Sequence, residues 1–578
     1  MKRLELGAIK HQWDNTLTSS NIRHSGVGLL ALRLCLVMAM AVIGFGCGGG
    51  VEERTPDRQH ADQGPVRGGV LRVLHESAKD LDPPVIDDIY EGTVANQIFE
   101  GLVRYDPTLG IAPSLAESWI VEDGGLRYTF HLRDDVHFHD GTPLSAAAVV
   151  ASLERVLSPD RVGDCIAETY LLQILGAREY RAGRATHITG LRAPDSRTVE
   201  VELTEPLSFF LAVLAMDQTR IVPTTLPPGS DGHPIGTGPF VYVGRQTDGD
   251  VEELVLERNA EYWGEPAYLD SLVFVSHLGQ TPTDEAKISL LLAGQVDVID
   301  VASRHMSRLR TLGYRISATP ELTISFVGVQ TQTPPLDDVR VRRAIAHCLD
   351  RNGFNGAEET EVVPATGIIP PGLPGYLPSP LALSYDPKRA GELLRSAGYG
   401  PDHPTATVRL YTSGEGRSYE YLRGRFTETL AEIGIPLEVE SMGWNDLDRI
   451  VLAGDAPLFL LGWLADVPDA DGFLYALFHT NAPNNLFGYS TPFVDDGLEG
   501  ARKMMPGPDR VLRYRAIEER ILSDVAIIPL YHDLTCVALN PEVSGVDLGP
   551  YGMPTLRFSR VYRVPVASGV PTFAEDRP

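Results

Sequence analysis

The chain has 578 residues, of which 43% are hydrophobic and 22% are charged. This composition is typical of a globular protein, and the length exceeds what one hydrophobic core supports, so two or three domains are expected. The formal net charge is −27. A nucleic acid backbone attracts the opposite sign, so the charge argues against DNA or RNA as a partner.

The amino terminus has the layout of an export signal. Five basic residues and two acidic ones precede Leu34, and an uncharged apolar run of 13 residues then extends to Gly46. A helix of this length spans roughly 20 Å, which is shorter than the ~30 Å core of a bilayer. Residues 1–46 are therefore predicted to be a signal peptide, and the protein is predicted to be exported.

Cys47 follows the apolar run and begins the sequence Cys47-Gly-Gly-Gly50. This cysteine resembles the lipid-attachment site of bacterial lipoproteins, although Gly44-Phe-Gly46 replaces the usual leucine and small residues. The resemblance implies a lipid anchor at Cys47, with residues 47–67 as a flexible tether, because Gly and charged residues bury little apolar surface. Cleavage near Cys47 without lipid attachment is the alternative.

The other four cysteines do not suggest a metal or disulfide framework. No two of the five have the short spacing of a zinc or redox motif. Cys348 shares a helical face with Val341, Ala344 and Ile345, so it is predicted to be a small buried apolar residue.

Strands and helices alternate from residue 68 onward, which predicts a mixed α/β architecture. Residues 126–133 alternate between apolar and polar side chains, as in a half-buried strand. Thr142-Pro143 is predicted to open a helix that runs to about Leu157. Asp386-Pro387 is predicted to open another helix, which Gly398 ends. The pattern does not tell parallel from antiparallel strand order.

Several short motifs occur in a fixed order over some 400 residues. They are Leu115–Trp119, Tyr128–Arg133, Val136–Gly141, Gly236–Phe240, Asn259–Gly264, Pro335–Ala344, Gly462-Trp463 with Asp466, and Ile528–Tyr531. Together they resemble the family 5 extracytoplasmic solute-binding proteins, which are the dipeptide, oligopeptide and nickel-binding receptors of ABC importers.

The resemblance implies a clamshell of two lobes, like other periplasmic binding proteins, with an additional inserted domain. Lobe I is expected to comprise residues 68–101, 236–328 and 530–578. The extra domain is expected at 102–235 and lobe II at 329–529. In this family the ligand lies between the lobes, which close around it by a hinge motion.

The resemblance also implies a ligand site. In peptide-binding members the aspartate three residues after the tryptophan pairs with the ligand's α-ammonium group, and Asp466 has this position after Trp463. Trp444 and Trp463 have the spacing of two tryptophans that line side-chain pockets, and core packing is the alternative for both. Arg417 is a candidate partner for a ligand carboxylate. Leu460 replaces an arginine found in oligopeptide-binding members, so peptide length and identity stay open.

The expected function is capture of a peptide or similar small ligand and its delivery to an ABC permease and ATPase. The alternatives are a receptor for a nickel complex, haem or a sugar conjugate, and a ligand sensor. A periplasmic metallopeptidase has less support, because the sequence lacks His-Glu-x-x-His, Gly-x-Ser-x-Gly and phosphate-loop motifs. His137, His139 and Asp140 are interpreted as structural, and no catalytic residue, metal or cofactor is expected.

Overall fold

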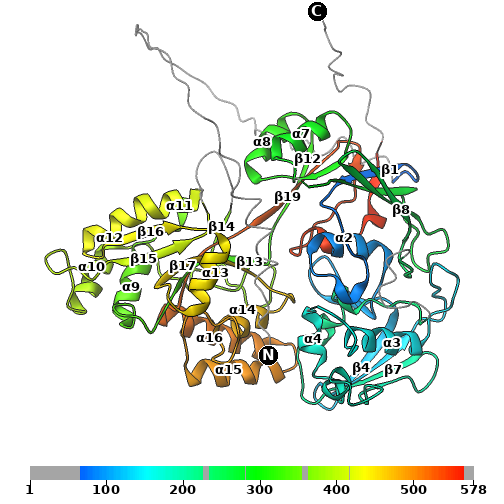
Figure 1. The fold of residues 1–578 in the computed structure, drawn as a ribbon, viewed down its shortest axis with the longest axis horizontal. Coiled ribbons are helices and arrows are strands. Elements are labelled where there is room, and N and C mark those ends of the chain that lie inside the picture. Colours follow the sequence, from blue (N-terminus) through cyan, green and yellow to red (C-terminus); the bar gives the residue numbers. More distant parts are fainter. Residues whose placement is uncertain are drawn as a thin grey trace, which may run out of the picture.

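The computed structural model describes residues 65–163, 165–224, 234–279, 281–354, 362–414 and 417–564. The predicted signal peptide and Cys47 lie outside these ranges. Three large sheets with covering helices organise the chain: two units lie on the right in Figure 1, and one lies on the left. In the described part of the chain, no helix is both long enough and apolar enough to cross a bilayer.

The first unit, which we call the first lobe, is built on a seven-stranded mixed sheet in the order β12-β19-β11-β1-β10-β9-β8. Helix α2 covers one face of this sheet, and α7 and α8 cover the other. The strands are β1 (Val70–Leu74), β8 (Phe240–Asp248), β9 (Val251–Arg258), β10 (Ser271–His277), β11 (Val298–Asp300), β12 (Arg315–Pro320) and β19 (Leu534–Leu539), and the helices are α2 (Ile89–Ile98), α7 (Asp284–Leu292) and α8 (Met306–Thr311).

The second unit, which we call the extra domain, contains a four-stranded antiparallel sheet in the order β4-β5-β7-β6. Its strands are β4 (Ala116–Glu122), β5 (Arg127–Leu132), β6 (Leu191–Arg192) and β7 (Thr198–Glu202), with β2 (Val103–Tyr105) and β3 (Ile111–Pro113) as a separate pair, and its helices are α3 (Ala146–Val156), α4 (Ile166–Leu171), α5 (Ala177–Arg181) and α6 (Phe210–Val213). The alternation predicted for residues 126–133 is confirmed, because Tyr128, Phe130 and Leu132 of β5 are buried and the residues between them are not.

The third unit, the second lobe, is built on a six-stranded sheet in the order β14-β18-β13-β17-β15-β16. Its strands are β13 (Thr323–Val329), β14 (Val363–Pro364), β15 (Val408–Thr412), β16 (Leu437–Ser441), β17 (Leu458–Leu464) and β18 (Ile527–His532), and its helices are α9 (Val339–His347), α10 (Pro387–Ser396), α11 (Arg417–Tyr421), α12 (Thr427–Ile433), α13 (Trp444–Ala453), α14 (Asp471–Phe478), α15 (Pro492–Lys503) and α16 (Pro508–Asp524). Apolar clusters cover both faces of the sheet. Cys348 is 1% exposed within one of them, as predicted.

Short elements complete the described chain. They are the strands β20 (Val543–Ser544) and β21 (Tyr562–Arg563), the 3-10 helices η2 (Pro83–Val85), η3 (Asp217–Thr219), η4 (Ser303–His305), η5 (Arg351–Phe354), η7 (Met553–Thr555) and η8 (Phe558–Arg560), and the π-helical turn η6 (Leu422–Phe426).

The two helix starts predicted from capping residues had different outcomes. The Asp386 side chain accepts a hydrogen bond from Arg389 N–H and caps α10, and Gly398 follows the helix with φ +93°, as predicted. The prediction that Thr142-Pro143 opens a helix is wrong. Thr142 instead hydrogen-bonds the Asp140 carboxylate in a tight turn, and α3 begins at Ala146 with Ser145 as its cap.

The motif Gly236–Phe240 has a packing role. A Cβ atom on Gly238 would lie 2.5 Å from the carbonyl oxygen of Gln97, near the end of α2. The motif Asn259–Gly264 contributes Tyr262 Oη and Trp263 Nε1, which each donate a 2.7 Å hydrogen bond to the buried Glu100. These motifs therefore hold α2 against the sheet of the first lobe.

Two strand crossings join the lobes. The chain passes from β12 to β13 through Glu321 and Leu322, and it returns from β18 to β19 through Asp533 (Figure 1). The extra domain also contacts the second lobe, because Ser208 N–H donates to Arg502 O at 2.8 Å and Lys503 pairs with Glu205 at 2.9 Å. The domain boundaries given from the sequence stay a prediction.

Replacing Gly238 by alanine tests the packing role of the Gly236–Phe240 motif. We expect Gly238→Ala to lower the free energy of unfolding by about 1–3 kcal/mol, because the new methyl group overlaps backbone at the end of α2. Gly244→Ala is the matched control, since a Cβ atom there meets nothing within 4 Å. Urea denaturation followed by circular dichroism measures both variants. Equal stability of the two would contradict this role.

Candidate functional site

Asp466 lies where three distant segments of the chain meet. It follows β17 in the second lobe, and Tyr170 of α4 in the extra domain donates a 3.5 Å hydrogen bond to its Oδ2 atom. Tyr551, from the carboxyl-terminal part of the described chain, donates to Asp466 O at 2.9 Å and to Ala465 O at 3.3 Å. Asp466, Tyr170, Tyr551 and Tyr105, which stacks on Tyr551 at 6.2 Å, are called the junction below.

The Asp466 carboxylate is accessible to water but is closely surrounded by protein. The resulting loss of hydration raises its pKa to about 6, and the hydrogen bond from Tyr170 lowers the pKa by less than burial raises it. In the part of the chain that the structure describes, Asp466 forms no ion pair with lysine, arginine or histidine. A cation placed at this carboxylate would therefore relieve an uncompensated desolvation cost.

The tyrosines of the junction are neutral hydrogen-bonding groups. Burial raises the pKa of Tyr105, Tyr170 and Tyr551 above the ordinary value of a phenol. Tyr105 Oη donates to Ala212 O at 2.7 Å, and the Tyr170 ring packs edge-on against Phe209 at 5.5 Å. The junction thus combines aromatic surface, hydroxyl groups and one carboxylate.

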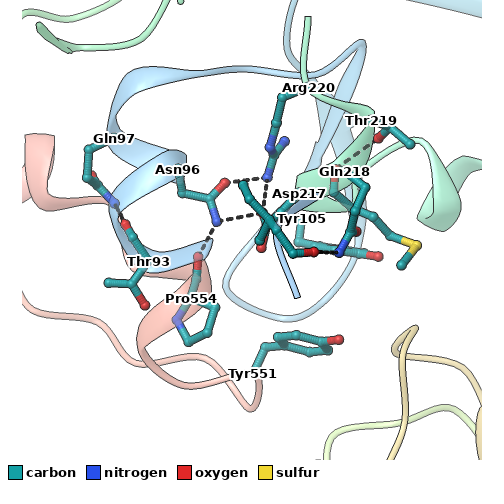
Figure 2. Close-up of polar contacts among 12 residues, drawn as sticks. Thr93, Asn96, Gln97, Tyr105, Asp217, Gln218, Thr219, Arg220, Tyr551 and Pro554 are labelled. Carbon is teal, nitrogen blue, oxygen red and sulfur yellow. Dashed lines mark hydrogen bonds and ion pairs between the residues drawn. The ribbon is translucent and has the colours of Figure 1, made fainter. Parts of the chain in front are cut away.

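A buried polar network fixes the segment that carries Tyr551 (Figure 2). Asn96 of α2 donates from Nδ2 to Asp217 Oδ1 at 3.0 Å and to Pro554 O, and Arg220 donates to Asn96 and to Asp217 Oδ1 at 3.1 Å. Arg220 is 7% exposed, so these charged contacts are largely shielded from water. The network connects α2, the segment around η3 and the loop that contains Tyr551, and it thereby holds Tyr551 in position.

The two predicted tryptophans lie on the same side of the second lobe. Trp463 Nε1 donates to Gly472 O at 2.8 Å, and both Trp463 and Trp444 are half-buried against one apolar cluster. Both therefore contribute to core packing and keep part of their surface accessible. Their role as pocket walls stays a prediction.

The outcomes for the other predicted positions differ. Leu460 is 2% exposed and packs on the opposite sheet face from Trp463, in the cluster that contains α9 and α10 residues. Arg417 is the first residue of α11, but its side chain lies outside the described residues, as does Cys47. The roles of Arg417 in ligand binding and of Cys47 in lipid attachment stay predictions.

One of the two histidines considered for metal binding, His139, has structural contacts. His139 hydrogen-bonds through its two ring nitrogens with Gly238 O at 3.0 Å and Gly236 N–H at 3.3 Å. Among the described residues, one group of three potential metal ligands brings its oxygens within 4.8 Å, and it consists of Asp87, Asp88 and Glu91. Asp88 caps α2, and Glu91 accepts a hydrogen bond from Asp80 N–H, so both carboxylates already serve the local fold.

Sequence reasoning missed the three tyrosines of the junction. Tyr170 and Asp466 are 296 residues apart, and Tyr551 is 85 residues from Asp466. No spacing or periodicity connects positions that only the tertiary fold brings together.

The chain is similar to known solute-binding proteins. A family model described as "Bacterial extracellular solute-binding proteins, family 5 Middle" matches residues 110–485. The probable di/tripeptide-binding protein 5 of Pseudomonas aeruginosa is 29% identical over 494 residues, which cover 81% of this chain and 90% of that protein. The periplasmic oligopeptide-binding protein OppA of Escherichia coli is 27% identical, over 82% of this chain and 89% of OppA.

A solved structure shares the fold. The periplasmic binding protein DppA from Helicobacter pylori, in complex with the peptide STSA, superposes with a TM-score of 0.64 at 26% identity. The match covers 86% of this chain and 98% of DppA. The two-lobed periplasmic binding protein architecture predicted from the sequence motifs is therefore confirmed.

We expect the Asp466 carboxyl to titrate with a pKa near 6 in the ligand-free protein, because protein surrounds it. Tyr170→Phe should raise that pKa further, since the lost hydroxyl favoured the charged form. Carboxyl-carbon NMR of protein labelled at aspartate measures both values, with Asp466→Asn used to assign the resonance. A pKa near 4 in both proteins would contradict the described environment.

Proposed function

Because the chain belongs to family 5 of the bacterial extracellular solute-binding proteins, we propose that it captures a peptide whose α-ammonium group binds Asp466. The two lobes would close around the ligand, and the closed, ligand-bound protein would deliver it to an ABC permease. The observation that carries the proposal is the Asp466 carboxylate, which is accessible to water and closely surrounded by protein but has no cationic partner among the described residues. An ammonium group supplies both the charge and the hydrogen-bond donors that this carboxylate needs.

The names of the relatives support a peptide as the ligand. The Pseudomonas aeruginosa and Escherichia coli proteins are named for binding di- and tripeptides and oligopeptides, and the Helicobacter pylori structure contains a peptide. The proposed role is binding without chemistry, as in the family to which the chain belongs. Trp444 and Trp463 would offer their accessible faces to ligand side chains, and Arg417 would meet a ligand carboxylate.

The two strand crossings suit a hinge. The covalent links through residues 321–322 and 533 are short, so rotation there moves one lobe relative to the other without disturbing either sheet. Ligand would stabilise the closed arrangement only through contacts that the open arrangement lacks. The proposed division between the lobes falls at these crossings, within a few residues of the boundaries expected from the sequence, and the extra domain is proposed to move together with the first lobe.

Asp466→Ala tests the assignment of the ammonium site. We expect titration calorimetry with di- and tripeptides to show that the variant loses about 2–5 kcal/mol of binding free energy, as for a charge partner that closure desolvates. Asp446→Ala, an exposed acid of α13 that pairs with Arg449, is the matched control and should bind as the unaltered protein does. A loss of less than tenfold at Asp466 would remove it from the site.

We further propose that the exported protein is held at the membrane by lipid on Cys47, on the outer side of the cytoplasmic membrane. Expression of Cys47→Ser in a bacterium fed radiolabelled palmitate tests this. The unaltered protein should carry label and sediment with membranes, whereas the variant should be unlabelled and released. Equal labelling of both proteins would contradict attachment at Cys47.

A further inference from the structure

The extra domain is joined to the first lobe by contacts that are shielded from water. Arg155 of the extra domain pairs with Asp82 of the first lobe, and their side chains are 13% and 14% exposed. Gln218 Nε2 donates a buried 2.7 Å hydrogen bond to Ile86 O. Together with the network around Asn96, these contacts support an extra domain and a first lobe that move as one body.

The polar contacts between the extra domain and the second lobe are more exposed. In the ion pair of Lys503 with Glu205, the side chains are 47% and 49% exposed, and such a pair stabilises a contact only weakly. Ser208 N–H donates to Arg502 O, and the Arg502 guanidinium lies 5.6 Å from the ring centroid of Phe209. These contacts can therefore break and form again more readily than the buried ones.

Apolar side chains cross between the extra domain and the second lobe in both directions. Val467, which directly follows Asp466 in the second lobe, is 0% exposed and packs in the apolar core of the extra domain. Leu109, in the turn between β2 and β3 of the extra domain, packs against an apolar cluster of the second lobe. The contacts across this boundary are called the clasp below, and its residues are Leu109, Glu205, Ser208, Phe209, Val467, Arg502 and Lys503.

The backbone at Leu109 indicates that the contact with the second lobe is the reason for a leucine there. Asp106 Oδ1 accepts hydrogen bonds from Thr108 N–H at 2.8 Å and Gly110 N–H at 2.9 Å, which fixes the turn. Leu109 has a φ of +66°, in the left-handed region that glycine or asparagine adopts at lower cost. Local geometry therefore does not favour leucine, whereas packing against the second lobe does.

We propose that the clasp favours the closed arrangement of the lobes before a ligand binds. This inference rests on the proposed function, in which the second lobe rotates relative to the first lobe and the extra domain. Separation of the lobes must then break the clasp, which lies next to Asp466. Because its polar contacts are weak and exposed, the ligand-free protein exchanges between joined and separated lobes, and a ligand completes the closure. A closed arrangement that is already partly populated lowers the apparent dissociation constant.

Distance measurements on the ligand-free, mature protein test this proposal. Nitroxide labels on Ala182→Cys in the extra domain and Ala516→Cys in the second lobe, both exposed positions, report the separation of the two parts by double electron–electron resonance. The Cys47→Ser substitution removes the cysteine at the start of the mature chain. The other native cysteines of that chain are buried, so the labels attach at the two introduced positions.

The unaltered protein should show a shorter-distance and a longer-distance population. Lys503→Glu, which places two acids opposite each other, should reduce the shorter-distance population at least twofold. Leu109→Asn, which suits the turn but removes the apolar contact, should do the same. Combining Lys503→Glu with Glu205→Lys should restore the population. Arg449→Glu is the matched control, because it makes the same change of charge in an ion pair within α13, and it should leave the distances unchanged.

The outcomes separate this inference from the proposed function. Two populations that neither Lys503→Glu nor Leu109→Asn changes would overturn the clasp and leave the hinge intact. A single, unchanged distance in every protein would overturn both, because the lobes then do not separate. A loss in Lys503→Glu that Glu205→Lys fails to restore would overturn the role of this ion pair. Thermal unfolding verifies that each variant is folded, and Glu205→Lys alone provides the test if Lys503→Glu is not.

Discussion

The proposed ligand site depends on one carboxylate, that of Asp466. Protein surrounds this carboxylate, but no cationic side chain among the described residues pairs with it. At Asp466 water reaches the side chain, yet the surrounding protein raises its pKa to about 6. Burial of a charge costs free energy unless a partner of opposite charge compensates it. Protonation or a bound cation would remove this cost, and the proposed function assigns the second role to the α-ammonium group of a ligand.

Much of the remaining structure keeps the junction in place. The Asn96, Asp217 and Arg220 network fixes the loop that brings Tyr551 to the Asp466 backbone. Glu100, which follows α2, accepts hydrogen bonds from Tyr262 and Trp263, and these bonds hold the end of α2 against the first lobe. These interactions lie within or beside the first lobe, whereas Asp466 belongs to the second. The junction thus combines groups from both lobes, which would move relative to each other in the proposed closure.

The sequence predicted the elements whose signals are local. Alternation of side chains along residues 127–132 was sufficient for β5, and Asp386 with Pro387 was sufficient for the start of α10. The start of α3 was misplaced because Thr142 serves the turn at Asp140 instead of capping a helix. Strand order could not be predicted, since it depends on contacts between residues far apart in the chain.

The candidate site was predictable only in part. Asp466, Trp444 and Trp463 were predicted from their positions in motifs of the family. Such motifs indicate the shared fold, but they do not indicate which contacts these residues make in this chain. Tyr170 and Tyr551 carry no local signal, because the tertiary fold alone brings them to Asp466.

The most direct test of the account is small-angle X-ray scattering of the mature protein with and without saturating peptide. Closure of the two lobes around a ligand at the junction predicts a smaller radius of gyration when peptide is bound. A radius of gyration that stays constant while calorimetry shows the same peptide bound would contradict capture between closing lobes.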